Sequence, residues 1–258
     1  MTDTVEPWLL HTTAAASGVR RYSVCGIPIN DLDAVAAADL IVSHAVTGTS
    51  FQVHLCNAYT LSLVDRDPRL REALLAGDLN LPDGAPVAWM ARGMDSGPVR
   101  GPGLVDAVAT AGRGLVRHYL WGGKEGIAER MAERLRHAIP SVDIVGTETP
   151  PFRQLSDEDL VALADRVRSS GANILWVGLG TPRQDYVVHR LAPLLNMPVV
   201  PVGAAFDFWS GAVQEAPSFL HGSGLEWLYR LSREPRRLWR RYLIGNPRFL
   251  VSAWRHSR

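Results

Sequence analysis

The sequence has few of the features that mark exported or metal-binding proteins. Its 258 residues include only two cysteines, Cys25 and Cys56. Neither belongs to a CxxC motif or to a Cys/His cluster with metal-ligand spacing, and both lie in apolar, strand-like runs. We therefore expect buried, reduced thiols in a cytoplasmic protein. The first ten residues lack both a basic segment and a sustained apolar segment, so we expect no signal peptide.

Long apolar runs and lysine are scarce as well. The most apolar stretches, residues 174–180 and 197–208, are far shorter than the roughly 20 residues needed to cross a bilayer. We therefore expect no membrane-spanning helix. Of the 27 basic residues only Lys124 is a lysine. Because arginine is used throughout the chain, its presence at one position says nothing specific about a site there.

Charge is distributed unevenly along the chain. Residues 224–258 contain nine arginines and two acids, Glu226 and Glu234, which gives this segment a net charge of about +7 and leaves about −6 for residues 1–223. The segment also carries Trp, Tyr and Leu side chains at roughly helical spacing. A basic amphipathic helix can lie among lipid headgroups or bind nucleic acid, and a solvated helix face is the third interpretation.

Short apolar runs alternate with helical patterns through the rest of the chain. The apolar runs predict strands at residues 22–29, 51–56, 116–121, 142–146, 174–178 and 198–203. Apolar residues at three- and four-residue spacing predict helices at 32–44, 69–76, 84–92, 103–111, 125–137, 156–170 and 182–195. This alternation predicts an α/β fold, a Rossmann-like parallel sheet flanked by helices. We expect a poorly ordered segment at 1–20, one α/β domain at 21–223 and a helical appendage at 224–258.

Ligands of parallel sheets bind beyond the carboxyl ends of the strands, so the loops there are the first place to seek a site. Asn57 directly follows the strand predicted at 51–56. It can cap the next helix, contact a ligand, or do both. Asp83 lies between Pro82 and Gly84 at a helix start, where a carboxylate is either a turn or capping residue or a general base.

Two glycine-containing loops also suit an anionic ligand. Gly122 and Gly123 end one strand and open a helix, an arrangement that lets the backbone approach a phosphate. The run from Gly178 to Asp185 contains a second glycine, Gly180, and Arg183 at a strand end. Helix capping explains part of this run, with Thr181 as N-cap, Pro182 at the first helical position and Gln184 closing a capping box.

These residues, together with further motifs, resemble the WecG/TagA/CpsF family of bacterial glycosyltransferases, glycosyltransferase family 26, from about Tyr22 onward. The motifs are Asn57, Leu81-Pro82-Asp83-Gly84, Trp121-Gly122-Gly123, Gly178-Leu179-Gly180-Thr181-Pro182-Arg183-Gln184-Asp185, Gly203-Ala204-Ala205-Phe206-Asp207-Phe208 with Gly211, Ala216-Pro217, and Gly224-Leu225-Glu226-Trp227-Leu228-Tyr229-Arg230-Leu231-Ser232-Arg233-Glu234-Pro235. Each motif alone is weakly specific, whereas their order and spacing together are highly specific. Arg183 and Asp185 replace the lysine and glutamate usual in the family and keep their charges.

The resemblance implies an inverting, metal-independent glycosyltransferase without a cofactor. It implies transfer of a sugar from a UDP-sugar to an acceptor on undecaprenyl diphosphate, in the synthesis of wall polymer, capsule or exopolysaccharide. Asp83 matches the family's general base. Contacts to the substrates are expected from Asn57, Gln184, Arg183, Gly122, Gly123, Gly178, Gly180, Arg230, Arg237 and Arg240.

The resemblance also implies that the appendage closes over the pocket and touches the anionic inner face of the cell membrane. We therefore expect a cytoplasmic, peripheral membrane enzyme with no nucleic-acid partner, and self-association is left open. Two alternatives come from other classes. One is a non-catalytic membrane- or nucleic-acid-binding protein that uses only the appendage. The other is an NAD-linked oxidoreductase, although the first βα unit has a single glycine, Gly26, and no GxGxxG turn.

Overall fold

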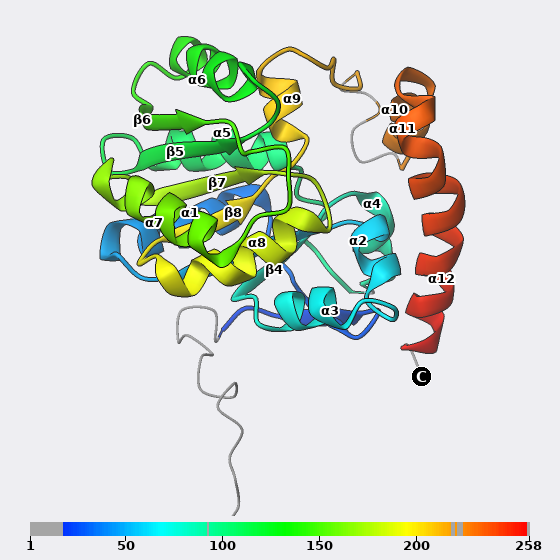
Figure 1. Cartoon of the computed structure of the whole chain (residues 1–258). Helices are drawn as coiled ribbons and strands as arrows, with labels where there is room; N and C mark the ends of the chain where they lie inside the picture. The colour runs from blue at the N-terminus through cyan, green and yellow to red at the C-terminus, as the bar shows by residue number, and fades with distance from the viewer. Residues whose placement is uncertain (1–17, 92, 218–219, 221–223, 257–258) are drawn as a thin grey trace, which may run out of the picture.

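The computed structural model describes residues 18–91, 93–217, 220 and 224–256. Within these residues the main sheet has six strands, all parallel, in the order β4-β3-β8-β7-β5-β6 (Figure 1). They are β3 (Phe51–Cys56), β4 (Leu79–Pro82), β5 (Arg117–Gly122), β6 (Asp143–Glu148), β7 (Ile174–Gly178) and β8 (Pro198–Pro201). The predicted Rossmann-like α/β fold is confirmed. The segment predicted to be poorly ordered falls almost wholly outside the described residues.

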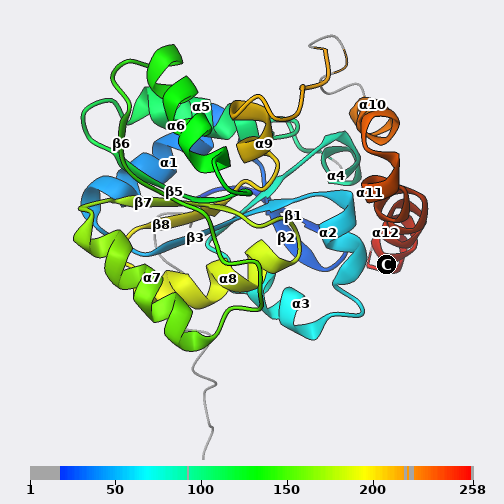
Figure 2. The same ribbon diagram turned by 45° about the horizontal axis from the view of Figure 1, so that its top comes forward.

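The body helices cover both faces of this sheet, which explains why its central strands are apolar along their whole length. Helices α1, α5, α6 and α9 pack on one face, and α7 and α8 pack on the other (Figure 2). The body helices are α1 (Ala34–Thr47), α2 (Ala58–Leu63), α3 (Pro68–Leu75), α4 (Ala85–Met90), α5 (Gly101–Ala111), α6 (Ile127–Ala138), α7 (Asp157–Ser169), α8 (Arg183–Leu191), the 3-10 turn η3 (Ala192–Leu194) and α9 (Ala205–Trp209). The short helices α2 and α9 were not among the predicted ranges.

The prediction of a single strand at residues 22–29 is wrong. These residues do not form one strand of the main sheet. They belong to an antiparallel hairpin of β1 (Arg21–Val24) and β2 (Ile27–Asn30). Cys25 and Gly26 form the two-residue turn with φ of 55° and 73°, and positive φ at both turn residues matches the twist of a hairpin. Strand β4 was also absent from the predicted ranges.

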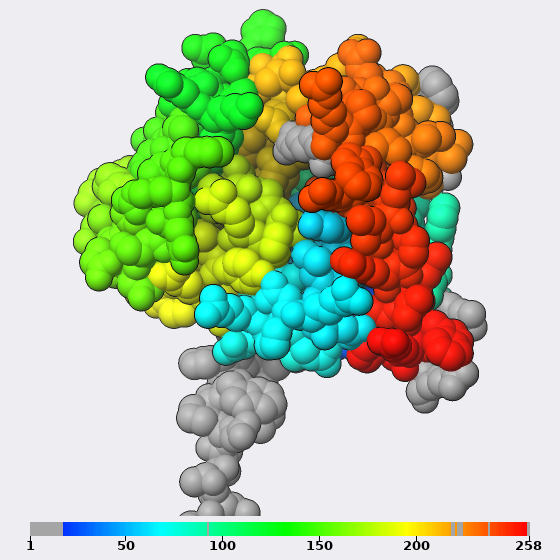
Figure 3. All heavy atoms as spheres, turned by 45° about the vertical axis from the view of Figure 1, so that its right-hand side comes forward, coloured from blue at the N-terminus to red at the C-terminus, as the bar shows by residue number. Residues whose placement is uncertain are grey.

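Four short helical segments end the described chain and lie along one side of the body. They are α10 (Glu226–Arg233), α11 (Pro235–Trp239), the π-helical turn η5 (Arg240–Ile244) and α12 (Gly245–Arg255). Figure 3 shows these C-terminal helices, in orange and red, beside the cyan segment that contains α2. Phe249 and Ala253 of α12 are buried in one cluster with Leu61 and Val64. The amphipathic pattern predicted from the sequence therefore corresponds to an inner face that packs on the body and an outer face that is exposed.

No helix among the described residues combines the length and the apolar character needed to span a bilayer. The division into an α/β domain at 21–223 and an appendage at 224–258 stays a prediction.

Candidate active site

A cleft opens at the carboxyl ends of β3, β4, β7 and β8, where parallel sheets bind their ligands. The C-terminal helices supply its other wall through Glu226, Trp227, Arg230, Arg241, Tyr242 and Asn246. The structure brings together five of the residues predicted from the sequence. Those that line the cleft are Asn57, Asp83, Gly180, Gln184 and Arg230.

Asn57 has the capping role that the sequence left open, and it also lines the cleft. Its side-chain carbonyl caps α2 by accepting from the amide of Thr60 at 3.0 Å. Its side-chain amide donates to Oδ2 of Asp83 at 3.2 Å. Because the cap fixes which way the amide points, the helix start also orients the contact with Asp83.

Asp83 leaves the sheet immediately after β4. Its backbone amide donates to the carbonyl of Cys56 at 2.9 Å, which ties the ends of β3 and β4 together. The N-cap position of α4 is taken by Gly84, with φ of 92°, so the carboxylate is not used as the cap. Asp83 lines the cleft instead, partly buried and within reach of a ligand.

The surroundings of Asp83 favour proton uptake. Burial raises the pKa of Asp83 above the usual aspartate value, while the hydrogen bond from Asn57 and the charges of Arg241 and Arg230 act in the opposite direction. A carboxylate with a raised pKa is a stronger base than a solvated one and is suited to accept a proton during a reaction.

Two arginines face this carboxylate from the C-terminal helices. The Nε atoms of Arg230 and Arg241 are buried and lack a hydrogen-bond partner within the described part of the chain. Cζ of Arg230 lies 5.3 Å from the ring centre of Phe208, and Cζ of Arg241 lies 5.1 Å from that of Tyr59. Guanidinium groups that are held by rings and keep N–H donors to spare suit a phosphate or diphosphate.

A third arginine ties the C-terminal helices to the body at the cleft. Nε of Arg100, at the start of α5, lies 3.0 Å from the carboxylate of Glu226 on α10, and its Nη2 lies 3.3 Å from Glu215. All three side chains are partly buried. The ion pairs therefore hold the first turn of α10 where Arg230 can enter the cleft.

The loop after β7 differs from its prediction. Pro182 occupies the N-cap position of α8, and a proline ring has no group that can accept the cap hydrogen bond, so the predicted capping box is wrong. Oγ1 of Thr181 donates to Oδ2 of Asp185 at 3.1 Å. Oε1 of Gln184 accepts from the amide of Gly180 at 3.0 Å, and Gln184 is buried at the cleft wall.

Other predicted residues lie away from the cleft lining. A Cβ on Gly122 would come within 2.5 Å of Gly178, and one on Gly178 within 2.5 Å of the Phe206 ring, so packing alone requires these two glycines. Gly123 has φ of 73° and its amide donates to the carbonyl of Gly178 at 3.0 Å. The loop glycines are thus explained by the approach of β5, β7 and α9.

Two of the predicted arginines, Arg183 and Arg240, do not line the cleft. Arg183 is exposed and its Nη2 donates to the carbonyl of Arg153 at 3.3 Å. Arg240 is exposed, with its Cζ 5.2 Å from the ring centre of Trp239. The side chain of Arg237 lies outside what the structure describes.

Arg241 was part of the basic segment but was not selected as a site residue. Its spacing of eleven positions from Arg230 gave no signal for a shared face, because α10 ends at Arg233 and the π-helical turn at Arg240–Ile244 changes the helical spacing. Among the described residues, no three His, Cys, Asp or Glu side chains come together in a group able to hold a metal.

Comparison with known proteins agrees with this geometry. The sequence model of the "Glycosyl transferase WecG/TagA/CpsF family" matches residues 22–258. A curated relative from Bacillus spizizenii, named N-acetylglucosaminyldiphosphoundecaprenol N-acetyl-beta-D-mannosaminyltransferase, is 28% identical over 198 residues, which cover 75% of this chain and 74% of the relative. The family match includes the sheet, the cleft and the C-terminal helices. The chain therefore belongs to the WecG/TagA/CpsF family of glycosyltransferases.

Proposed function

We propose that this glycosyltransferase moves a sugar from a UDP-sugar to an acceptor carried on undecaprenyl diphosphate, with inversion at the anomeric carbon and without a metal. The observation that carries the proposal is the meeting of the Asp83 carboxylate with Arg230 and Arg241 in a single cleft. Asp83 supplies a base, and Arg230 and Arg241 supply positive charge with unused N–H donors.

The proposed reaction is a single displacement. The acceptor hydroxyl attacks the anomeric carbon of the donor sugar, and Asp83 takes the hydroxyl proton as the new C–O bond forms. The bond between the anomeric carbon and the diphosphate oxygen breaks on the opposite face, and UDP leaves with the electron pair. Arg230 and Arg241 favour this step by balancing the charge of a diphosphate in the cleft.

The acceptor class is proposed from the relative. The name of the Bacillus spizizenii protein specifies a sugar diphosphate of undecaprenol and an N-acetylmannosaminyl group. Because the two chains share 28% identity over three quarters of their lengths, we extend the lipid-diphosphate acceptor to this enzyme and leave the donor sugar to the assay. Such a product is an intermediate of bacterial cell-surface polysaccharides.

The outer face of the C-terminal helices supports peripheral attachment to the inner face of the cell membrane. Leu243, Leu250 and Trp254 are exposed large apolar residues on these helices, and Arg236 and Arg248 are exposed among them. A face that combines apolar and basic side chains binds at an anionic lipid surface. This position would bring the cleft to an acceptor whose lipid stays in the bilayer.

The two alternatives have less support. A non-catalytic binding protein does not require a base with a raised pKa in a cleft, and family membership argues against both it and an oxidoreductase.

A UDP-release assay tests the proposal. The protein is given a panel of UDP-sugars with and without an undecaprenyl-diphosphate-linked N-acetylglucosamine acceptor, in buffer with and without EDTA. We expect acceptor-dependent release from one donor, unaffected by EDTA and lost in Asp83→Asn. Release in Asp83→Asn at the parental rate would remove the base from the mechanism, and loss of release in EDTA would contradict metal independence.

A further inference from the structure

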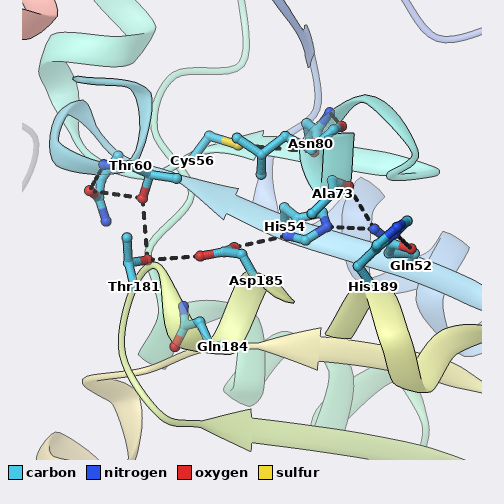
Figure 4. Close-up of polar contacts among 12 residues, drawn as sticks. Gln52, His54, Cys56, Thr60, Ala73, Asn80, Thr181, Gln184, Asp185 and His189 are labelled. Atoms are coloured by element: carbon cyan, nitrogen blue, oxygen red, sulfur yellow. Dashed lines mark hydrogen bonds and ion pairs between the residues drawn. The ribbon is translucent and has the colours of Figure 1, made fainter. Parts of the chain in front are cut away.

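We propose that the buried pair of Asp185 and His54 is a positioning device for the base Asp83. The inference rests on the proposed function, because positioning matters only if Asp83 accepts a proton. The pair lies behind the cleft wall, and Figure 4 shows the contacts that lead from it through Thr181 to Thr60. From Thr60 the contacts continue through Asn57 to Asp83.

The pair itself is fully enclosed. Nδ1 of His54, in the middle of β3, lies 2.9 Å from Oδ1 of Asp185 on α8, and both side chains are 0% exposed. Nε2 of His54 lies 2.8 Å from Nε2 of Gln52, which also donates to the carbonyl of Ala73 at 2.7 Å. That second bond fixes the amide of Gln52 as the donor to His54. His54 therefore accepts at Nε2 and donates through Nδ1–H to Asp185.

The second oxygen of Asp185 leads to the active site. Oδ2 of Asp185 accepts from Oγ1 of Thr181 at 3.1 Å. The single hydroxyl hydrogen of Thr60 is shared between Oγ1 of Thr181 at 3.3 Å and Oδ1 of Asn57 at 3.2 Å. Oδ1 of Asn57 also accepts from the backbone amide of Thr60 at 3.0 Å, so the amide end of Asn57 is directed at Asp83.

The arrangement joins four parts of the fold at one point. His54 belongs to β3 and Thr60 to α2, Thr181 and Asp185 lie just before and within the first turn of α8, and Asp83 directly follows β4. A buried carboxylate is costly unless all of its lone pairs meet donors. Here the donors that satisfy Asp185 are the ones that lead to Asn57, so satisfying the buried charge also fixes the rotamers at the active site.

Thr60 offers the sharpest test because it is 0% exposed and is absent from the cleft lining. Thr60→Val removes the hydroxyl at nearly constant volume, and Thr60→Ser keeps it. We expect Thr60→Val to lower kcat about 10- to 100-fold, the range for a small misplacement of a catalytic group. We expect the donor KM to stay near its parental value and Thr60→Ser to restore most of kcat.

The pair is tested with two buried histidines. His54→Phe breaks the contact with Asp185, whereas His118→Phe removes an imidazole that is 2% exposed and bonded to Trp176 at 3.0 Å, away from the cleft. A purely structural role predicts that both variants lose thermal stability and keep kcat. The proposal predicts that only His54→Phe loses kcat. If His54→Phe does not fold, Thr181→Val replaces it as the test, because it removes the hydrogen bond from Thr181 to Asp185.

Titration of Asp83 by carbon NMR of the side-chain carboxyl, identified by its loss in Asp83→Asn, gives a readout that needs no turnover. The hydrogen bond from Asn57 lowers the pKa of Asp83, so loosening it in Thr60→Val should raise that pKa. The other groups that act on Asp83, unchanged in the variant, are Glu226, Arg230, Arg241 and the nearby thiol of Cys56.

The outcomes separate this inference from the proposed function. No transferase activity in the parent with any donor would contradict the proposed function, while a raised Asp83 pKa in Thr60→Val would still support positioning. A parental kcat and an unchanged Asp83 titration in Thr60→Val would overturn the positioning role, even if Asp83→Asn is inactive.

Discussion

Asn57 and Asp83 lie on neighbouring strand ends, and the 3.2 Å hydrogen bond between them joins a helix cap to the candidate base. The same asparagine closes the first turn of α2 and lowers the pKa of Asp83 against the effect of burial. Local folding and the chemistry of the cleft thus depend on one side chain.

Asn57→Ala should therefore change both stability and the pH profile. Loss of the cap should cost about 1 kcal/mol in free energy of unfolding. Loss of the hydrogen bond should raise the pKa of Asp83, so the acid limb of kcat/KM should move to higher pH. Asp33→Ala is the matched control, because Asp33 caps α1 in the same way, accepting from the amide of Ala36 at 2.8 Å. An acid limb that stays in place in Asn57→Ala would contradict the role given to this bond.

Because the pKa of Asp83 is raised in the folded protein, the contribution of Asp83 to the free energy of unfolding should depend on pH. A carboxyl whose pKa is higher in the folded than in the unfolded protein stabilises the fold below the unfolded value, near pH 4, and this contribution is lost as pH rises through the folded pKa. The amide in Asp83→Asn does not titrate. The melting temperature of Asp83→Asn relative to the parent should therefore increase from about pH 4 upward and then level off. A difference that falls with pH would mean that the pKa is lowered instead.

Arg241→Gln should impair turnover more than Arg236→Gln. The guanidinium of Arg241 faces Asp83 and has a buried Nε without a partner in the described structure, whereas Arg236 is exposed on α11. Loss of a charged contact to a diphosphate should cost about 2 kcal/mol, or some 30-fold in kcat/KM. Steady-state kinetics with Arg240→Gln in parallel would decide which of the two adjacent arginines acts. Equal effects of Arg241→Gln and Arg236→Gln would indicate a general charge effect.

The sequence predicted the parts of this site that depend on local pattern. The apolar strand at 51–56 placed Asn57 at the edge of the sheet where ligands bind, and the structure shows it in the cleft with Asp83 and Gln184. The resemblance to the family supplied the role of Asp83 and the substrate contact of Gln184. The N-terminal hairpin was missed because Cys25 in its turn is apolar and rarely has φ of 55°, so the run 22–29 looked like one strand.

Contacts that depend on packing could not be predicted in this way. His54 sits within an apolar strand, and its partner Asp185 is 131 residues away in the chain, so no local pattern links them. The choice of Arg241 over Arg240 depends on the π-helical turn η5 and on Pro235 at the start of α11, which set the rotation of the last helices. Gly122 and Gly178 appeared to be phosphate contacts because close backbone packing selects the same residue as close ligand approach.

Phe249→Ala should show how firmly α12 is fixed to the body. Phe249 is 1% exposed and packs in the cluster that contains Leu61 and Val64 of the α2 region, so its truncation should cost about 3–5 kcal/mol in free energy of unfolding. The neighbouring Leu250 is 57% exposed, and Leu250→Ala should have little effect on denaturant unfolding. Equal, small effects of the two substitutions would mean that α12 detaches readily from α2 in solution.

The outer face of the same helices should bind anionic vesicles in two separable ways. Attraction between exposed arginines and lipid headgroups is screened by salt over a Debye length of about 8 Å at physiological ionic strength, so binding should weaken as salt increases. Insertion of Leu250 and Trp254, which are 57% and 56% exposed, should persist at high salt. Leu250→Ser with Trp254→Ser should therefore abolish the salt-resistant part of binding, whereas Arg248→Gln should reduce only the salt-sensitive part. Sedimentation with vesicles containing phosphatidylglycerol, compared with neutral vesicles, measures both.

Binding that is equal on the two vesicle types and independent of salt would exclude the electrostatic contribution. Unchanged salt-resistant binding in the double variant would exclude insertion of Leu250 and Trp254 as its source.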